Sequence, residues 1–328
     1  MVILGIESTA HTASVGIVTE TAQVLAIASD MHRPTRGGIH PREAANHHVE
    51  VLPGLVARAL EQGHVRPSEI DAVAFAQGPG LGPCLRAGAT VARTLSLAWD
   101  RPLVPVNHCV AHVEIARVLS GLDDPMLLYA SGGNTQVIAH AAGRYRVLGE
   151  TLDIGIGNFL DKLWIALGGT FPGGPAIERE ARLGQELLPL PYSVHGMDVA
   201  FSGMFTAAKA LHDQGANRPD LTYSVEATAY SMLTEITERA LAHRKRDTVV
   251  LGGGVACNQR LRGMVQTMVE ERGGTSYAPP ANLCVDNGAM IAWTGHLAFG
   301  QGLTATVEGS AVQPRQRTDL VPAPWRAP

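Results

Sequence analysis

The stretch MVILGIESTAHTASVGIVTETAQVLAIAS, residues 1–29, decides the fold because its pattern returns later in the chain. Three short β-branched runs (residues 2–6, 13–18 and 24–29) are separated by turns of small residues, which predicts a meander of three strands. MLLYASGGNTQVIAHAAGRYRVLGETL, residues 126–152, repeats the same order of strands and turns. A repeated unit of this kind indicates two related lobes.

Outside the two meanders, strand-like runs alternate with helical periodicity, which is typical of an α/β protein. We expect helices near residues 42–62, 85–98, 108–119, 224–244, 258 onward and 286–298, and further strands at 70–76, 103–106 and in DTVVLGGGVA, residues 247–256. The faint boundary at residues 121–125 predicts a first lobe of residues 1–124 plus 300–328 and a second lobe of residues 125–299.

Composition excludes several classes of protein. The 328 residues carry a formal net charge of −4, so the surface as a whole does not attract nucleic acid, although Arg33, Arg36 and Arg42 could form a local face for RNA or a partner. None of the three lysines lies in a G-x-x-x-x-G-K-[ST] motif, which excludes a Walker P-loop. The four cysteines form no C-x-x-C pair. With neither a basic leader nor an apolar span, the sequence predicts a cytoplasmic protein without a membrane partner.

Three turns that follow apolar strands could approach phosphates: GIESTAHT (5–12), SGGNT (131–135) and LGGGVACN (251–258). Glycine lets backbone N–H groups come close to an anion, and hydroxyls add further donors. Any single one could be an ordinary turn, but together they favour a nucleotide held between the lobes. DIGIGN (153–158) has Leu160 where a dinucleotide fingerprint needs its third glycine, so a Rossmann assignment is weak. The two-lobed pattern resembles the actin–Hsp70–sugar-kinase superfamily and implies an α/β, actin-like ATPase fold with an inter-lobe nucleotide cleft.

A candidate metal site lies in VNHCVAHVE, residues 106–114. His108 and His112 are four residues apart on an expected helix, so both can reach one ion, and imidazoles suit zinc or iron(II). The alternative is a pair of histidines on a helix surface. Tyr129 and Asp286 could add oxygen ligands if the turns meet, although Asp286 could equally be a helix N-cap. Cys109 stands where a metallopeptidase of the H-E-x-x-H type has its general base, which weakens that reading.

Nine blocks in order resemble the universal tRNA threonylcarbamoyladenosine transferase family: GIESTAHT, GGIHPREAANHH, NHCVAHVEIAR, YASGGNTQV, LDIGIGNFLDK, FPGGPAIE, GMDVAFSG, LGGGVACNQRLR and DNGAM. They span nearly the whole chain. Ala10 and His11 stand where bacterial relatives carry a Cys-Asp pair, so the chain is more similar to the archaeal–eukaryotic branch, the catalytic subunit of the KEOPS complex.

The resemblance implies an enzyme that transfers the threonylcarbamoyl group from threonylcarbamoyl-adenylate to N6 of the adenosine 3′ of the anticodon in tRNAs reading ANN codons. It implies one divalent ion, iron or zinc, on His108, His112, Tyr129 and Asp286. The carbamoyl and phosphate part of the adenylate would contact Tyr129, Ala130, Ser131, Gly132 and Gly133. The nucleoside would contact Asp161, Gly174 and Glu178, with Asn258 on the adenosine loop.

The resemblance also implies partners beyond tRNA: a small kinase-like ATPase, a small dimerising subunit and a subunit that binds the end of tRNA. His11 and Glu7 are candidates for a general base. Two other functions are compatible with the fold: an ATP-dependent phosphotransferase, and a nucleotide-binding scaffold without activity.

Overall fold

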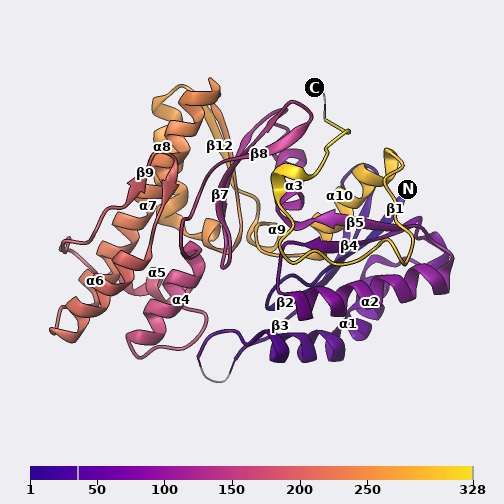
Figure 1. Cartoon of the computed structure of the whole chain (residues 1–328), viewed down its shortest axis with the longest axis horizontal. Helices are drawn as coiled ribbons and strands as arrows, with labels where there is room; N and C mark the ends of the chain where they lie inside the picture. Colours follow the sequence, from indigo (N-terminus) through magenta and orange to yellow (C-terminus); the bar gives the residue numbers. More distant parts are fainter. Residues whose placement is uncertain (35–36, 327–328) are drawn as a thin grey trace.

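The computed structural model describes residues 1–34 and 37–326, so Arg36 lies outside the described residues. The chain forms two lobes, each built on a five-stranded sheet (Figure 1). The first sheet has the order β3-β2-β1-β4-β5 and the second has the order β12-β11-β6-β7-β8. In both sheets the meander strands pair antiparallel, and the two later strands run parallel to the first meander strand. The repeat predicted from the two meanders is therefore confirmed as one topology used twice.

The six meander strands and three further strands follow the predicted runs, whereas no strand was predicted at residues 194–195, 198–199 or 275–277. The first sheet contains β1 (Val2–Glu7), β2 (Thr12–Thr19), β3 (Val24–Met31), β4 (Ala72–Gly78) and β5 (Leu103–Asn107). The second contains β6 (Met126–Ala130), β7 (Thr135–Ala141), β8 (Arg144–Glu150), β11 (Thr248–Gly252) and β12 (Thr275–Tyr277). The short strands β9 (Val194–His195) and β10 (Asp198–Val199) form a separate ribbon.

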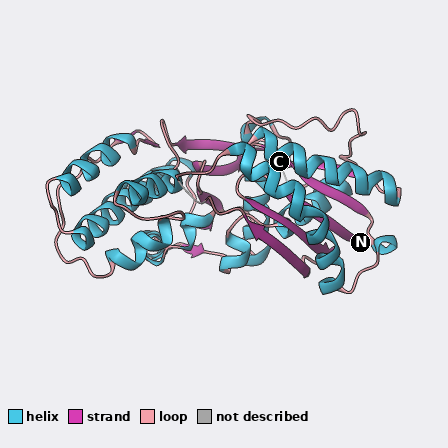
Figure 2. Cartoon of the chain, turned by 90° about the horizontal axis from the view of Figure 1, so that it is seen from below, coloured by secondary structure: helices cyan, strands magenta, loops and turns pink. Residues whose placement is uncertain are grey.

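Helices cover both faces of the sheets (Figure 2). The first lobe is covered by α1 (Pro41–Gly63) and α2 (Gly82–Trp99) on one face, and by α3 (His108–Ser120) and α10 (Gly288–Gly300) on the other. The second lobe packs its sheet against α4 (Ile156–Ala166), α5 (Gly174–Ala181), α6 (Ser202–Asp213), α7 (Arg218–Arg244) and α8 (Gln259–Glu271). Shorter segments are α9 (Ala281–Cys284), η1 (Pro67–Glu69), η2 (Gly254–Cys257) and η3 (Thr318–Leu320).

Helix α10 belongs to the first lobe, although the sequence placed residues 125–299 in the second. Gly5 of β1 pairs with Gly16 of β2, and this pair forms a flat patch on which the helix lies. A Cβ atom at Gly5 would stand 2.2 Å from the Ala292 nitrogen, and one at Gly16 would stand 2.2 Å from the Ala289 nitrogen. Only glycine permits so close an approach of a helix backbone to a sheet. The predicted boundary is wrong here because the chain returns from the second lobe to the first lobe before α10 begins.

The C-terminal segment joins the two lobes, whereas the sequence assigned residues 300–328 to the first lobe alone. It starts on the first sheet, where Ala305 bridges Leu103 and the Gln313 nitrogen donates to the Gln77 carbonyl over 2.8 Å. It ends on the second, where Pro322 bridges Arg144. The pattern of this irregular segment contained no signal for such a crossing.

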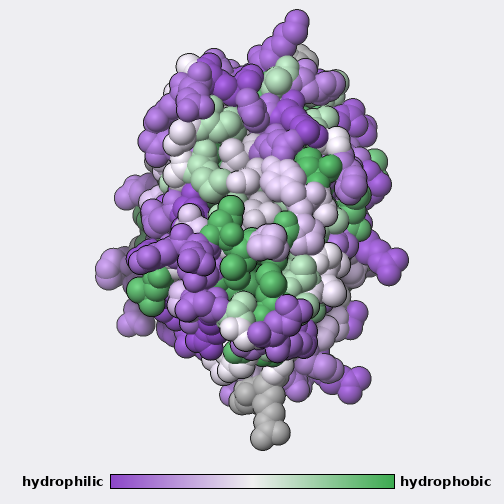
Figure 3. All heavy atoms as spheres, turned by 90° about the vertical axis from the view of Figure 1, so that its left-hand side faces the viewer, coloured by the Kyte–Doolittle hydropathy of each residue, from purple (hydrophilic) through white to green (hydrophobic). Residues whose placement is uncertain are grey.

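The surface offers few further clues. No helix in residues 1–34 and 37–326 combines the length and the apolar character that a membrane crossing requires. At the outer end of the second lobe, hydrophobic side chains gather in the middle of a largely hydrophilic face (Figure 3). All four cysteines are free thiols.

Candidate functional site

The candidate metal residues depend on where α3 begins. Asn107 ends β5 and caps α3, because its side-chain oxygen accepts a hydrogen bond from the Val110 nitrogen over 3.1 Å. His108 therefore falls in the first turn of the helix and His112 lies one turn later. The helix packs against the inner faces of both sheets, so these side chains are buried, with 3% and 1% of their surface exposed. The alternative of histidines on a helix surface is excluded.

Four donor atoms from three segments meet at this point. His108 Nε2 lies 2.8 Å from the Tyr129 hydroxyl and 3.6 Å from Asp286 Oδ1, and His112 Nε2 lies 3.1 Å from the same Oδ1. In a tetrahedral site with metal–ligand bonds of about 2.0 Å, neighbouring ligand atoms lie about 3.3 Å apart. The three distances between the donor atoms here lie on either side of that value. Two imidazoles with carboxylate and phenol oxygens are a donor set that suits iron or zinc.

Asp286 reaches this cluster because it is not a helix cap. The adjacent Asn287 caps α10 instead, through a bond from the Met290 nitrogen to its Oδ1 over 2.9 Å. The Asp286 carboxylate is consequently left to face the two histidines. The N-cap alternative for Asp286 is wrong by one residue.

Glu7 supports His108 from behind. Its carboxylate is fully buried and accepts bonds from His108 Nδ1 over 2.8 Å and from the Thr9 nitrogen and hydroxyl over 2.6 and 2.5 Å. A carboxylate on Nδ1 fixes the ring so that Nε2 is directed at the other donors, an arrangement common behind metal-bound histidines. This position argues against Glu7 as a general base, since it has no contact with the cleft. Thr9 is a supporting residue that the sequence reasoning missed.

The charges at this point favour a cation. Burial by itself would lower the pKa of His108, but Glu7 and Asp286 raise it to about 9. Burial would likewise raise the pKa of Asp286, but His108 and His112 hold it well below its usual range. The carboxyl groups of Glu7 and Asp286 therefore lie against the two buried imidazoles. A bound cation would be stabilised by such a set of groups, so the residues fit a divalent metal.

A cavity of about 240 Å³ lies between the lobes above these donors. Eight of the predicted residues line it: His11, Ser131, Gly132, Asp161, Gly174, Glu178, Asn258 and Asp286. Phe171, the first residue of the FPGGPAIE block, also lines it, as does Tyr230, which no quoted motif includes. The phosphate-type turns and the carboxylates predicted for a nucleoside therefore share one hollow.

Not every predicted residue reaches this cavity. Ala130 is buried in the core of the second lobe at the end of β6, and Gly133 is exposed in the following turn. Neither residue lines the cavity, and Tyr129 does not line it either. Of the five residues predicted to contact the carbamoyl and phosphate part, Ser131 and Gly132 line it.

The DIGIGN stretch supports the glycine turn, and one of its residues, Gly157, also lines the cavity. The Gly157 nitrogen donates to the Ser131 carbonyl over 3.0 Å, and the Asn158 nitrogen donates to the Gly132 carbonyl over 3.0 Å. A Cβ atom at Gly157 would lie 2.7 Å from Gly132 Cα. The glycines of DIGIGN are thus explained by the close contact between two backbone segments, and not by dinucleotide binding.

Asn258 is held by protein groups on both ends of its amide. Its Oδ1 caps α8 by accepting from the Arg260 and Leu261 nitrogens over 2.9 and 3.2 Å. Its Nδ2 donates to the buried Glu226 carboxylate over 2.6 Å. Asn258 therefore shapes one wall of the cavity, and both ends of its side-chain amide already have protein partners. Glu226, in the middle of α7, could not be found from sequence because no motif surrounds it.

The carboxylates on the second-lobe wall are oriented by backbone N–H groups. Asp161 Oδ1 accepts from the Gly173 nitrogen over 2.7 Å, and burial raises the pKa of this group. Glu178 accepts from the Gln259 nitrogen over 3.2 Å. Across the cavity, the His11 ring stands edge-on to Phe171 with ring centres 5.4 Å apart.

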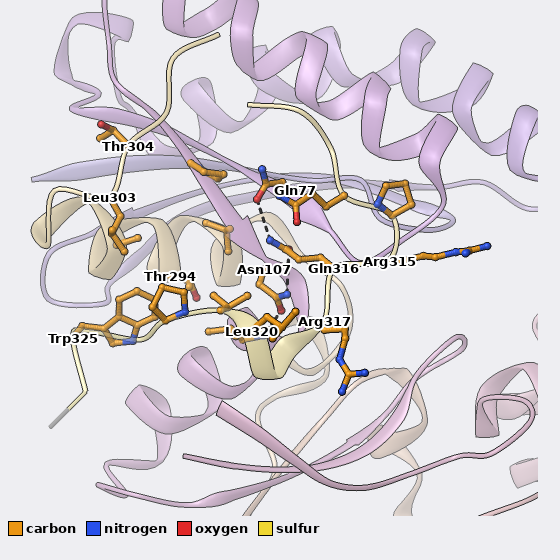
Figure 4. Close-up of a pocket in the computed structure, with 18 residues that line it drawn as sticks. Gln77, Asn107, Thr294, Leu303, Thr304, Arg315, Gln316, Arg317, Leu320 and Trp325 are labelled. Atoms are coloured by element: carbon orange, nitrogen blue, oxygen red, sulfur yellow. Dashed lines mark hydrogen bonds between the residues drawn. The ribbon is translucent and has the colours of Figure 1, made fainter. Parts of the chain in front are cut away.

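A larger hollow of about 880 Å³ lies away from these residues, under the C-terminal segment (Figure 4). Its floor holds a ladder of amides in which Gln316 donates to Gln77 over 3.0 Å and accepts from Asn107 over 3.1 Å. Arg315 and Arg317 extend away from this ladder. The hollow contains none of the predicted site residues, so its size does not make it the nucleotide site.

The family follows from comparison with known proteins. The family model for tRNA N6-adenosine threonylcarbamoyltransferase, TsaD, matches residues 20–293. The chain belongs to this family. A protein of this name from Archaeoglobus fulgidus is 53% identical over 325 residues, which cover 99% of this chain and 100% of that protein.

Other relatives are longer. A probable bifunctional tRNA threonylcarbamoyladenosine biosynthesis protein from Thermoplasma volcanium is 51% identical over 325 residues, covering 99% of this chain and 62% of the relative. The chain thus spans about three fifths of the length of such bifunctional relatives.

Solved structures confirm the fold. HypF from T. kodakarensis superposes with a TM-score of 0.65 at 15% identity, over 92% of this chain and 48% of HypF. Component A of (R)-2-hydroxyglutaryl-CoA dehydratase from Acidaminococcus fermentans gives a TM-score of 0.57 at 14% identity, over 90% and 98% of the two chains. The predicted two-lobed actin-like ATPase fold is confirmed.

Proposed function

We propose that this chain transfers a threonylcarbamoyl group from threonylcarbamoyl-adenylate to N6 of the adenosine 3′ of the anticodon in tRNAs that read ANN codons. Membership of the transferase family supports the reaction. One structural observation carries the proposal: His108, His112, Tyr129 and Asp286 converge directly beneath a cavity that holds the predicted nucleotide residues.

The donor would lie in this cavity with its adenosine toward Asn258 and its phosphate toward the Ser131–Gly132 turn. Carboxylates such as Asp161 and Glu178 suit ribose hydroxyls. The Gly132 nitrogen has no acceptor among the described residues, so it is available to a phosphate or carbamoyl oxygen. A backbone N–H held in place in this way stabilises the negative charge that develops on such an oxygen during transfer.

We assign the four converging donors to a single iron or zinc ion. When bound, such an ion supplies Lewis-acid polarisation of an oxygen of the donor. Glu7 keeps the His108 ring oriented and its Nδ1 proton in place. His11, on the opposite wall from Asp161, is the residue we assign to the proton of the attacking amine. AMP would leave with the electron pair of the cleaved bond.

Partners belong to the same proposal. A chain with a formal charge of −4 and three lysines has little positive charge for tRNA, so we expect binding to need other subunits. We propose partners of the KEOPS type: a small kinase-like ATPase, a small dimerising subunit and a tRNA-end binder. The bifunctional relatives, which extend well beyond the matched region, are consistent with a system of several components. A cytoplasmic location stays a prediction.

Single-turnover transfer tests the proposal. The pure chain is mixed with threonylcarbamoyl-adenylate and unmodified ANN-decoding tRNA, with and without partner subunits, and modified adenosine is measured by mass spectrometry. We expect product with the wild type and with His243→Ala, an exposed histidine of α7, and none with His108→Ala. Transfer by His108→Ala at the wild-type rate would overturn the metal role.

The same assay, run also with ATP and a hydroxyl acceptor, separates the alternatives. An ATP-dependent phosphotransferase of this fold would consume ATP in the presence of a hydroxyl acceptor and form no modified adenosine. A nucleotide-binding scaffold would bind the adenylate and leave the tRNA unchanged even with all partner subunits present.

A further inference from the structure

Two cysteines at the wall of the nucleotide cavity have no part in the proposed reaction. Cys257 is the last residue of η2 and Cys284 is the last residue of α9, and these two elements pack against each other. The Gly253 nitrogen donates to the Cys284 carbonyl over 2.9 Å, and Cys284 Sγ lies 3.5 Å from the Gly253 carbonyl oxygen. The same Gly253 carbonyl accepts from the nitrogen of Ala256, the residue before Cys257, over 3.1 Å. The Cys284 sulfur therefore lies against the turn that ends at Cys257.

The two thiols differ in access. Cys257 is partly exposed and lines the cavity, whereas Cys284 is fully buried against the core of the second lobe. Cys84 and Cys109 are buried elsewhere. A small reagent entering the cleft can thus meet only one of the four cysteines.

The surroundings of Cys257 favour its thiolate. The residue directly precedes Asn258, the N-cap of α8, so it sits at the positive end of a helix. Arg262 is anchored to the Ala256 carbonyl by a bond of 2.7 Å, which keeps its guanidinium nearby. The hydrogen bond from Cys284, together with Arg262, lowers the pKa of Cys257 to about 7. By contrast, burial raises the pKa of Cys84 to about 11.

We propose that Cys257 is an oxidation site in the cleft and that Cys284 is its resolving thiol. The oxidant is a hydroperoxide. The Cys257 thiolate attacks one peroxide oxygen, an S–O bond forms, the O–O bond breaks, and hydroxide leaves. The Cys284 thiol then attacks the Cys257 sulfur, an S–S bond forms, the S–O bond breaks, and the departing hydroxide takes the Cys284 proton as water. Peroxide is reduced by two electrons, and both thiols together are oxidised by two.

Such a bond would connect two parts of the proposed site. Cys257 adjoins Asn258 on the adenosine side of the cavity, and Cys284 stands two residues before Asp286. A disulfide would tie the adenosine loop to the segment that carries Asp286, and a dithiol would release it. The oxidation itself does not depend on the transferase activity, so its test and the transfer assay can fail independently.

Peptide mapping of the full chain tests the proposal. The protein is exposed to hydrogen peroxide, blocked with iodoacetamide, unfolded, and digested without reductant for mass spectrometry. We expect a linked peptide that joins Cys257 and Cys284, lighter by two hydrogen atoms and lost on treatment with dithiothreitol. Cys84 and Cys109 should become alkylated only after unfolding. Unmodified Cys257, or a linkage to another cysteine, would overturn the proposal.

Two further measurements separate the roles of the two thiols. Cys284→Ser should leave a sulfenic acid on Cys257 that dimedone traps, whereas the matched control Cys84→Ser should form the same disulfide as the wild type. Because Cys284→Ser removes a buried thiol and could unfold, alkylation of the wild type is measured as well. Cys257 should react at least tenfold faster than Cys84 in the folded chain, with a midpoint near pH 7. Equal rates would refute the assignment.

Discussion

Replacing Glu7 by Gln offers the sharpest test of the proposed metal site. In the wild type, one carboxylate oxygen accepts from the Thr9 nitrogen and hydroxyl over 2.6 and 2.5 Å, and the other accepts from His108 Nδ1 over 2.8 Å. A glutamine must turn its carbonyl toward the two Thr9 donors, which leaves its NH2 group facing His108. An NH2 group only donates, so Nδ1 must accept and the imidazole proton moves to Nε2.

That shift inactivates His108 as a ligand, because Nε2 is the atom directed at Tyr129 and Asp286. Loss of an outer-shell partner typically weakens metal affinity about 10- to 100-fold, or about 1.4–2.7 kcal/mol. We expect Glu7→Gln to fall in this range when zinc or iron(II) is titrated against a competing chelator. Glu20→Gln, an exposed glutamate on the next turn, should bind metal like the wild type.

Wild-type metal affinity in Glu7→Gln would refute this reasoning. If metal binding were retained and only transfer were lost, Glu7 would act on the substrate as a base, contrary to its burial beneath the cleft. A urea unfolding curve for each variant shows whether a loss of metal reflects the ligand or the fold.

Three other substitutions test separate features. Gly157→Ala places a methyl group 2.7 Å from Gly132 Cα, so adenylate binding measured by calorimetry should weaken while Gly203→Ala, with open space around it, changes nothing. Asn258→Ala removes a helix cap and a partner of a buried carboxylate, and should lower the free energy of unfolding in urea by about 1–3 kcal/mol; an unchanged value contradicts the assigned bonds. Partial burial opposes ionisation of Asp153, but N–H groups of the 201–202 turn and of the next residue lower its pKa to about 2. The wild type should therefore exceed Asp153→Asn in stability above about pH 4, and this gap should close as the pH falls toward 2; a constant gap would exclude the linkage.

Local pattern was enough to predict most strands and most helices. β1 and β6 are buried on both faces and consequently appear as continuous apolar runs, and each is followed by a turn of small residues. The i, i+4 spacing of His108 and His112 predicted a shared face, and the structure brings their Nε2 atoms toward one carboxylate. These features are local, so a single sequence contains them.

Long-range packing could not be predicted in the same way. Nothing around α10 shows that it lies on the Gly5–Gly16 pair, because Gly5 faces Ala292, 287 residues later in the sequence, and Gly16 faces Ala289, 273 residues later. Glu226 escaped notice because its partner Asn258 lies on another element. Glu7 was a candidate for the general base because the sequence does not show that Thr9 and His108 surround it. Its hydrogen bonds place it behind His108 instead.

The origin of the four converging side chains has a mechanical consequence. His108 and His112 stand on a helix that follows the first sheet, Tyr129 ends a strand of the second sheet, and Asp286 lies where the chain returns to the first lobe. A metal ion bound by all four side chains would connect the two lobes where they meet. Two lobes bridged in this way would keep a fixed angle to each other. The metal-bound protein should then unfold in a single thermal transition. Its substrates would enter the cavity without a change in the angle between the lobes, which suits an enzyme that holds a labile donor.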